Sequence, residues 1–221
     1  MTNNKNELKV IKTEDGSYSI YNEELDETYH SIHGALQESN HVFIKNGLGL
    51  MDKKNISILE VGLGTGLNAA LTCIEAAKRG LTIRYTAVEP YPLSEEMIEK
   101  VAKGYPNEIA DLQMKIAKTE ARQHKNINAN FNFIWHLIQI QTFNFSDKYD
   151  LIYFDAFAPD KQPDMWTPEL FRKMYDVLNP DGILTTYCAK GAVKRNLKLA
   201  GFTIKSVEGP PGKREMTIGY K

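Results

Sequence analysis

The stretch LEVGLGTGLN, residues 59–68, decides the fold of this chain. It joins a short apolar run at 56–61, which holds several β-branched residues, to a stretch with helical spacing at about 67–79. Glycines in such a loop let the backbone approach a ligand where side chains would collide. The start of the following helix offers free backbone N–H groups. The stretch therefore predicts a ligand-binding turn between a buried strand and a helix.

The spacing of the glycines separates two classes of nucleotide site. The dinucleotide fingerprint needs a third glycine in G-x-G-x-x-G, but position 67 holds Leu67. The order here is G-x-G-x-G after the acidic Glu60. This resembles motif I of class I methyltransferases, where the loop passes under the methionine and ribose of S-adenosylmethionine. A second acidic residue, Glu89, follows a predicted strand at 82–88, and its carboxylate can accept two hydrogen bonds from a ribose diol.

Strand-like and helix-like patterns alternate along the rest of the chain, which indicates a parallel sheet with right-handed crossovers. A hairpin is expected in 8–30, around the turn signal Asp15-Gly16, and residues 31–50 combine a helical start with a glycine-rich end. Further strands are expected at 131–140, 149–154, 182–188, 202–207 and 215–220, and helices at 168–178, at 191–200 and within 93–125, with a break near Gly104-Tyr105-Pro106.

These elements predict an α/β fold of the class I methyltransferase, Rossmann-like type. We expect a mostly parallel, doubly wound sheet that ends in a C-terminal antiparallel hairpin. Residues 1–50 would form an N-terminal β extension and a substrate-side segment. Residues 51–221 would form the methyltransferase domain, with a small helical insertion at about 93–125.

Composition indicates a cytoplasmic protein without a metal centre. The 221 residues carry a formal net charge of -1, and no apolar run approaches the roughly 20 residues that cross a bilayer. The first ten residues lack the apolar core of a signal peptide. Cys73 and Cys188 have neither metal-like nor redox-like spacing. The spacing of His30, His33 and His41 suits no metal site.

Basic residues gather at the end of the chain. Residues 190–221 contain eight Lys and Arg but only two acidic residues, Glu208 and Glu215. Such an end on a near-neutral chain permits a local phosphate-binding face, although composition alone favours an ordinary solvated surface. The side chains expected to contact phosphates are Lys190, Lys194, Arg195, Lys213 and Arg214.

The most unusual stretch is YDLIYFDAFAPDKQPDMW, residues 149–166. Asp155 ends the predicted strand, and ligands in open α/β sheets bind at the carboxyl ends of strands. Asp155 is therefore expected in the same crevice as the glycine loop, unless it only caps its own loop. Phe157, Pro159 and Trp166 suit a pocket for a flat base, although Trp166 is equally consistent with core packing.

A carboxylate in this place fits methyl transfer to an amine. The transfer from a sulfonium is an in-line displacement, so the protein has to place a lone pair and exclude water. An alkyl amine is mostly protonated in water, since its pKa is near the roughly 10.4 of lysine. Asp155 could orient the amine by accepting a hydrogen bond and could also take the proton.

The segment DAFAPDKQPDMWTPELF, residues 155–171, is similar to the signature of the MnmC-like methyltransferases. The resemblance covers nearly the whole chain. Its further parts are ESNHVF (38–43), NGL (46–48), VGLGTGLN (61–68), EPYP (89–92), AGF (200–202) and GKREM (212–216).

The resemblance implies an activity on tRNA. The family methylates the aminomethyl group of a wobble uridine, giving 5-methylaminomethyl-2-thiouridine, with S-adenosylmethionine as methyl donor. In many bacteria the domain is fused to a flavin-dependent oxidase. Because this sequence ends at Lys221, the resemblance implies the standalone form, without oxidase or flavin.

The resemblance also implies roles for individual residues. Asp155 would be catalytic. The cofactor would be held by Glu60, Gly62, Gly64, Gly66, Asn68, Glu89 and Pro90. The substrate would meet Glu38, Phe157, Pro159, Lys161, Met165, Trp166, Lys190, Lys213 and Arg214.

One departure and two rival functions remain. The family usually has Gly-Asp after the third strand, where the carboxylate reads the adenine amino group, whereas this chain has His136 and Leu137. A methyltransferase or aminopropyltransferase for a small free amine would share the fold and an acidic residue near Asp155. A non-catalytic RNA-binding module would have an eroded cofactor site, and Leu137 is its only support.

Overall fold

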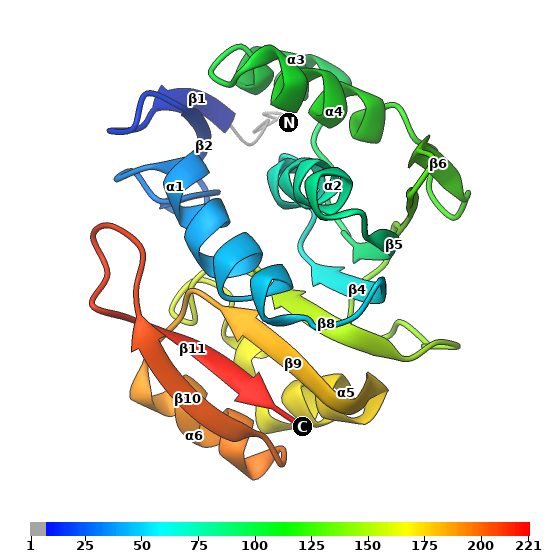
Figure 1. The fold of residues 1–221 in the computed structure, drawn as a ribbon. Helices are drawn as coiled ribbons and strands as arrows, with labels where there is room; N and C mark the ends of the chain where they lie inside the picture. The colour runs from blue at the N-terminus through cyan, green and yellow to red at the C-terminus, as the bar shows by residue number, and fades with distance from the viewer. Residues whose placement is uncertain (1–7) are drawn as a thin grey trace.

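The structure is a computed structural model that describes residues 8–221; residues 1–7 of the predicted 1–50 segment lie outside this range. An eight-stranded sheet forms its centre, in the order β10-β11-β9-β8-β4-β5-β7-β6, and a separate three-stranded sheet, β1-β2-β3, lies beside it (Figure 1). The central strands are β4 (Asn55–Val61), β5 (Thr82–Val88), β6 (Lys125–Asn128), β7 (Phe131–His136), β8 (Tyr149–Phe154), β9 (Leu178–Thr186), β10 (Thr203–Glu208) and β11 (Glu215–Tyr220).

The order of the strands places a switch point between β4 and β8. From β4 the chain runs outward through β5 to β7, and then it returns to β8 and continues outward on the other side to β9. All of these neighbours pair in parallel. Strand β11 pairs antiparallel with β9 and β10, which confirms the C-terminal hairpin. Ligands of open α/β sheets bind at such a switch point.

Helices cover both faces of the central sheet. Helix α2 (Leu67–Arg79) packs with the N-terminal helical segment on one face, and α5 (Pro168–Val177) packs with α6 (Gly191–Leu199) on the other. Because side chains alternate along a strand, β4 feeds both layers. Ile58 belongs to the first apolar cluster, whereas Leu59 and Val61 belong to the second.

The predicted insertion consists of two helices, α3 (Glu95–Ala102) and α4 (Asn107–Ala117). Helix α3 begins at Ser94, whose hydroxyl accepts a hydrogen bond from the backbone N–H of Met97. The break between the helices falls on residues 103–106, as the sequence predicts. Helix α4 packs on α2, and α3 touches the N-terminal sheet, so the pair lies above the start of α2 (Figure 1).

The N-terminal segment begins with the predicted hairpin. Strands β1 (Leu8–Lys12) and β2 (Tyr18–Asn22) pair antiparallel, and a short β3 (Glu27–Thr28) extends this sheet. The Asp15 carboxylate stabilises the turn by accepting hydrogen bonds from Thr13 and Ser17. The chain then enters α1 (Ala35–Ser39), a π-helical stretch η1 (Asn40–Lys45) and the 3-10 turn η2 (Leu48–Leu50). The domain boundary near residue 50 stays a prediction.

Two strands differ clearly in their bounds from the sequence-based expectation, and one strand was not expected. Strand β7 ends at His136 rather than at residue 140, because its partner β5 ends at Val88, opposite His136. Strand β9 covers 178–186 rather than 182–188, since its last partner on β11 is opposite Thr186. The edge strand β6 was not expected, because its sequence KNIN is polar and short.

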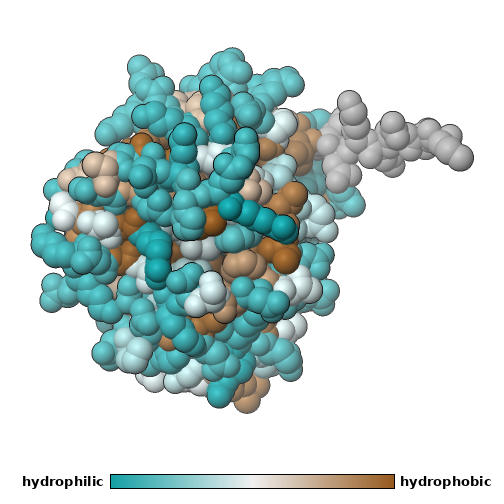
Figure 2. Space-filling view, turned by 90° about the vertical axis from the view of Figure 1, so that its right-hand side faces the viewer, coloured by the Kyte–Doolittle hydropathy of each residue, from teal (hydrophilic) through white to brown (hydrophobic). Residues whose placement is uncertain are grey.

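In the described part of the chain, no helix is long and apolar enough to cross a membrane. Figure 2 shows one face of the molecule, on which hydrophilic side chains predominate and hydrophobic ones are scattered.

Candidate active site

Two strand ends meet at the switch point. Gly62 follows β4 and Asp155 follows β8, and the Asp155 amide donates to the Val61 carbonyl at 3.0 Å. Gly62 has a φ of +90°, and a Cβ atom at this position would lie 2.5 Å from the Asp155 carbonyl oxygen. No side chain fits there, so the first glycine of the loop is required by the close approach of β8. The predicted proximity of Asp155 to the glycine loop is confirmed.

Asn68 links the glycine loop to the catalytic candidate. It lies in the first turn of α2, and its Nδ2 donates to Glu60 Oε1 at 3.0 Å and to Asp155 Oδ2 at 2.8 Å. Both Asn68 and Glu60 are buried. Asn68 Oδ1 is also buried but has no hydrogen-bond partner among the described residues, whereas Glu60 interacts with the Tyr85 hydroxyl. Buried polar atoms without partners are rare, so Asn68 Oδ1 fits a site where a ligand supplies a donor.

Glu89 is held by the loop that it faces. Its Oε2 accepts from the Gly64 amide at 3.2 Å, and its Oε1 accepts from the Tyr91 amide at 2.9 Å. Burial raises the pKa of Glu89, and these backbone hydrogen bonds partly offset the rise. The backbone amide of Leu63 also donates to this carboxylate, and three donors leave part of its acceptor capacity free. Glu89 therefore keeps the capacity to accept hydrogen bonds from a ribose diol.

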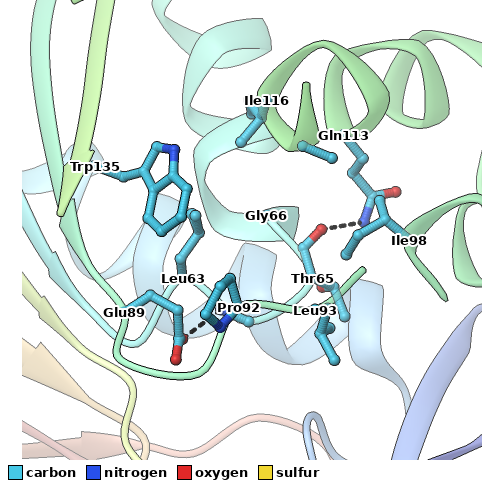
Figure 3. Close-up of a pocket in the computed structure, with 12 residues that line it drawn as sticks. Leu63, Thr65, Gly66, Glu89, Pro92, Leu93, Ile98, Gln113, Ile116 and Trp135 are labelled. Atoms are coloured by element: carbon cyan, nitrogen blue, oxygen red, sulfur yellow. Dashed lines mark hydrogen bonds between the residues drawn. The ribbon is translucent and has the colours of Figure 1, made fainter. Parts of the chain in front are cut away.

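Helix α4 supports the glycine loop from above. Gln113 Nε2 donates to the Thr65 carbonyl at 3.0 Å, and Ile116 packs against Gly66 (Figure 3). A small cavity of about 40 Å³ lies between this helix, the loop and the ring of Trp135. From the other side, His30 Nε2 lies 2.9 Å from Thr65 Oγ1. The loop conformation is thus fixed by segments that are remote in sequence.

A cleft of about 1430 Å³ opens over the strand ends. Its walls come from three parts of the chain: the N-terminal segment, the loops after β4, β5, β7, β8 and β9, and the β10–β11 turn. Tyr29 forms part of one wall, where its ring meets Phe157 edge-on with 5.0 Å between the centroids. Of the predicted site residues, the cleft is lined by Glu38, Gly62, Gly64, Glu89, Pro90, Asp155, Phe157, Lys161, Met165 and Lys213.

The Asp155 carboxyl group is electrostatically unusual. Burial, together with the nearby Glu38 carboxylate, raises the pKa of Asp155 to about 7. The hydrogen bond from Asn68 and the charge of Lys213 act in the opposite direction. Burial also raises the pKa of Glu60 well above its ordinary value. Carboxyl groups with a pKa near neutrality are typical of general bases.

Two residues that were predicted to contact a flat base, Trp166 and Pro159, do not line the cleft. Trp166 does not line the cleft, because its side chain is only 3% exposed and packs against Phe154, Phe171 and Tyr187. Its indole N–H donates to the Phe157 carbonyl at 2.8 Å, so Trp166 supports the cleft wall from behind. Pro159 is also absent from the cleft lining among the described residues.

The predicted basic face is largely neutralised. Lys190 pairs with Asp160, Lys194 Nζ lies 2.6 Å from Glu215 Oε2, and Lys213 Nζ lies 2.6 Å from Glu38 Oε1. Arg195 and Arg214 are exposed cations at this end of the molecule. Three of the basic residues in 190–221 are therefore paired with carboxylates, and fewer positive charges remain unpaired than the sequence alone indicates.

Several residues of the site gave no signal in the sequence. Tyr29, His30, Gln113 and Tyr187 surround the loop and the cleft, but each comes from a segment without a recognisable motif. At the end of β7, the His136 ring packs on Phe143 with 4.6 Å between the centroids. The side chain of Leu137 is 49% exposed.

A family model and several known proteins are similar to this chain in sequence. A family model described as S-adenosyl-L-methionine-dependent methyltransferase matches residues 93–221. The "tRNA 5-methylaminomethyl-2-thiouridine biosynthesis bifunctional protein MnmC" of Marinomonas sp. (strain MWYL1) is 28% identical over 221 residues, which cover 93% of this chain and 32% of that protein. The protein of the same name from Leptospira borgpetersenii (strain JB197) is 32% identical over 212 residues, which cover 88% and 32%. The chain thus spans about a third of the length of these relatives.

Solved structures share the fold. The crystal structure of MNMC2 from Aquifex aeolicus matches with a TM-score of 0.80 and 22% identity, over 99% of this chain and 72% of that one. Spermidine synthase from Thermotoga maritima matches with a TM-score of 0.51 and 12% identity, over 96% and 68%. At these identities the likeness shows the class I methyltransferase type of α/β fold, as the sequence predicts.

Proposed function

The chain belongs to this family of S-adenosyl-L-methionine-dependent methyltransferases, and we propose that it methylates the aminomethyl nitrogen of 5-aminomethyl-(2-thio)uridine at the wobble position of tRNA. One observation carries the proposal: a carboxyl group with a pKa of about 7, Asp155, faces the cleft beside the glycine loop. The printed name of the MnmC relatives, which concerns tRNA 5-methylaminomethyl-2-thiouridine, supports the choice of amine. Both tRNA and the reaction would be cytoplasmic.

The residues present fit S-adenosylmethionine. Gly62 and Gly64 keep the loop free of side chains, and Glu89 can accept from the ribose hydroxyls. The partnerless Oδ1 of Asn68 suits a donor of the methionine ammonium group. When bound, S-adenosylmethionine supplies an electrophilic methyl group on a sulfonium centre. No metal or flavin is needed for this displacement.

Asp155 would prepare the amine for attack. The aminomethyl group arrives mostly as an ammonium ion, since free alkyl amines have a pKa near roughly 10. The ionised Asp155 carboxylate accepts a hydrogen bond from this group and then takes one proton, which leaves a lone pair directed at the methyl group. Asn68 fixes the orientation of the carboxylate through its 2.8 Å hydrogen bond. Tyr29, Phe157 and Tyr187 line the same cleft and exclude water around the reacting nitrogen.

A second candidate is a methyltransferase or aminopropyltransferase for a small free amine. The observation that favours it is the neutralisation of Lys190, Lys194 and Lys213 by carboxylates, which weakens the case for a polyanionic substrate. The cleft volume of about 1430 Å³ favours the tRNA nucleoside, because a small amine would fill little of it.

A transfer assay tests the proposal and its rivals together. The protein is incubated with methyl-labelled S-adenosylmethionine and tRNA that carries 5-aminomethyluridine, with unmodified tRNA and spermidine as parallel substrates. Label on the first tRNA alone is the expected result. Label on spermidine would establish the small-amine activity instead. If calorimetry detected no binding of S-adenosylmethionine, the chain would be a non-catalytic RNA-binding module.

A further inference from the structure

Lys213 is anchored inside the cleft rather than presented to solvent. It lies in the turn between β10 and β11, and its Nζ donates to Glu38 Oε1 at 2.6 Å. The same Nζ lies 3.9 Å from the centroid of the Tyr187 ring, within the range of a cation–π contact. Only a third of the Lys213 side chain is exposed, at 33%. A lysine that contacts phosphates would instead extend its ammonium group into solvent.

Glu38 is held just as firmly on the opposite side. Its side chain is 8% exposed, and its Oε2 accepts from the Ser31 amide at 2.7 Å. Both carboxylate oxygens of Glu38 are therefore engaged, one by a cation and one by the backbone. These two contacts fix the position of the Glu38 carboxylate, so that its charge can act on a neighbour.

The neighbour is Asp155. Glu38, Lys213 and Asp155 all line the same cleft. Tyr187, which carries Lys213 on its ring, donates its hydroxyl to the carbonyl of Ala156, the residue after Asp155, at 2.9 Å. The pair thus brings one negative and one positive charge to the catalytic carboxyl group from two different segments.

Other titratable groups complete the surroundings of Asp155. From β4, Glu60 shares the Asn68 amide with it. Tyr85 from β5 and Tyr187 after β9 are within electrostatic range. Glu89 and His30 face the same cleft from the loop after β5 and from the N-terminal segment. Among these groups, Lys213 contributes the cation.

We propose that Lys213 and Glu38 are positioning residues, which set the charge state of Asp155 by opposing one another, and that neither contacts tRNA phosphates. This inference rests on the role of Asp155 in the proposed function. Lys213 favours the ionised carboxylate that can accept a proton from the amine. Glu38 holds the Lys213 ammonium group in place and opposes its effect, so that Asp155 can still hold a proton near neutral pH.

The electrostatics of the site support opposite effects of the two residues. The Glu38 carboxylate raises the pKa of Asp155, and the Lys213 ammonium group lowers it. Removal of the cation leaves Asp155 under the influence of the Glu38 charge alone, which disfavours ionisation of Asp155. Removal of the Glu38 charge leaves Asp155 beside an unopposed cation. The two substitutions are therefore expected to move the titration of Asp155 in opposite directions.

A titration by carbon-13 NMR tests this without any substrate. The Asp side-chain carboxyl carbons are labelled, and Asp155→Asn identifies the signal of Asp155. In Lys213→Met the midpoint of this signal should rise by about one pH unit, and in Glu38→Gln it should fall by a similar amount. The double variant should titrate close to the unsubstituted protein. Unchanged midpoints in both single variants, or shifts of the same sign, would overturn the proposal.

The pH profile of methyl transfer provides the second readout. The acidic limb of the kcat/KM profile should move to higher pH in Lys213→Met and to lower pH in Glu38→Gln. Lys213→Arg keeps the charge and should leave the limb at its original pH. If Lys213 contacted a phosphate, its loss in Lys213→Met would leave the acidic limb at the same pH. It would also lower the salt dependence of tRNA binding by about one charge. That result in Lys213→Met would contradict the inference.

The two readouts separate the inference from the proposed function. Opposite NMR shifts without methylation of aminomethyl tRNA would support the charge pair and reject the tRNA activity. Methylation of that tRNA with unmoved NMR midpoints would do the reverse. If Lys213→Met does not fold, as judged by circular dichroism, Glu38→Gln still tests the sign of the effect, because glutamine keeps the shape of the side chain that it replaces.

Discussion

The side-chain amide nitrogen of Asn68, Nδ2, donates a 2.8 Å hydrogen bond to Oδ2 of Asp155. The helix that follows the glycine loop therefore fixes the carboxyl group at the end of β8. This bond joins the first turn of α2 to the residue that follows β8. It also favours the ionised form of Asp155 by lowering its pKa. A change on α2 should therefore be felt in the chemistry of a residue that is distant in sequence.

Asn68→Ala should lower kcat of methyl transfer by about 10- to 100-fold, since Asp155 loses both its orientation and a hydrogen bond to its charged form. The acidic limb of the pH profile should move upward. Steady-state kinetics across pH measure both effects, with the exposed Asn126→Ala as a matched control. A fall in kcat without any movement of the limb would show that Asn68 acts on geometry alone.

Asp155→Asn should stabilise the fold in a pH-dependent way. The folded pKa of about 7 lies above the ordinary 3.8, so the folded chain holds this proton more tightly than the unfolded chain. The stability that Asp155 contributes is present below about pH 4 and is lost as the pH rises through 7. The neutral side chain avoids this loss.

Asp155→Asn should increase the free energy of unfolding, and this gain should grow between pH 4 and pH 7. Above pH 7 the gain should reach about 2 kcal/mol, after allowance for the partial exposure of the group. Urea unfolding at several pH values measures the gain. The exposed Asp181→Asn is the control and should be flat across this range. Equal pH dependence in the two variants would argue against a buried, perturbed Asp155.

Gly62→Ala should be considerably more harmful than Gly80→Ala. Both glycines have a positive φ, but a Cβ at position 62 would lie 2.5 Å from a backbone oxygen, whereas nothing lies within 4 Å of one at position 80. Gly80→Ala should cost only the conformational strain of about 1 kcal/mol. Gly62→Ala should cost a further 1–3 kcal/mol, roughly, because β4 and β8 have to separate. Thermal unfolding compares them directly, and equal losses would mean that β8 tolerates the displacement.

Glu89→Ala should weaken the binding of S-adenosylmethionine by at least about tenfold, since the ribose loses an acceptor and the Gly64 amide loses its partner. Calorimetry with S-adenosylhomocysteine measures the change. Glu99→Ala, an exposed glutamate on α3, is the control. Unaltered affinity in Glu89→Ala would place the ribose elsewhere in the cleft.

Arg195→Ala and Arg214→Ala should each reduce the salt dependence of tRNA binding by about one charge. Lys194→Ala should have a smaller effect, because Lys194 is paired with Glu215. Fluorescence anisotropy at increasing salt concentrations provides the slopes. Identical slopes in all three variants would indicate that tRNA approaches from another face.

Much of the architecture follows from local patterns in the sequence. The glycine loop, Glu89 and Asp155 are all placed by one rule, that the carboxyl ends of parallel strands meet at one edge of a sheet. Alternating strands and helices then predict the order of the elements. Strand ends were less predictable, because β7 stops where its neighbour β5 stops, and that depends on pairing rather than on residue type.

The charges of the site could not be predicted in this way. The sequence shows eight basic residues near its end, but not that Lys194 meets Glu215 or that Lys213 meets Glu38. These pairs join segments that only tertiary packing brings together. The position of Trp166 also depends on tertiary packing. It was expected to contact a base, but it packs in the core against Phe154 and Phe171.

The contact between Glu38 and Lys213 joins residues that are 175 positions apart. At the usual rates of translation, a ribosome needs roughly 10 to 35 seconds to add that many residues. The glycine loop and Asp155 are synthesised before Lys213. The Glu38 carboxylate therefore stays without this cation until the turn between β10 and β11 has been made and has packed into the cleft.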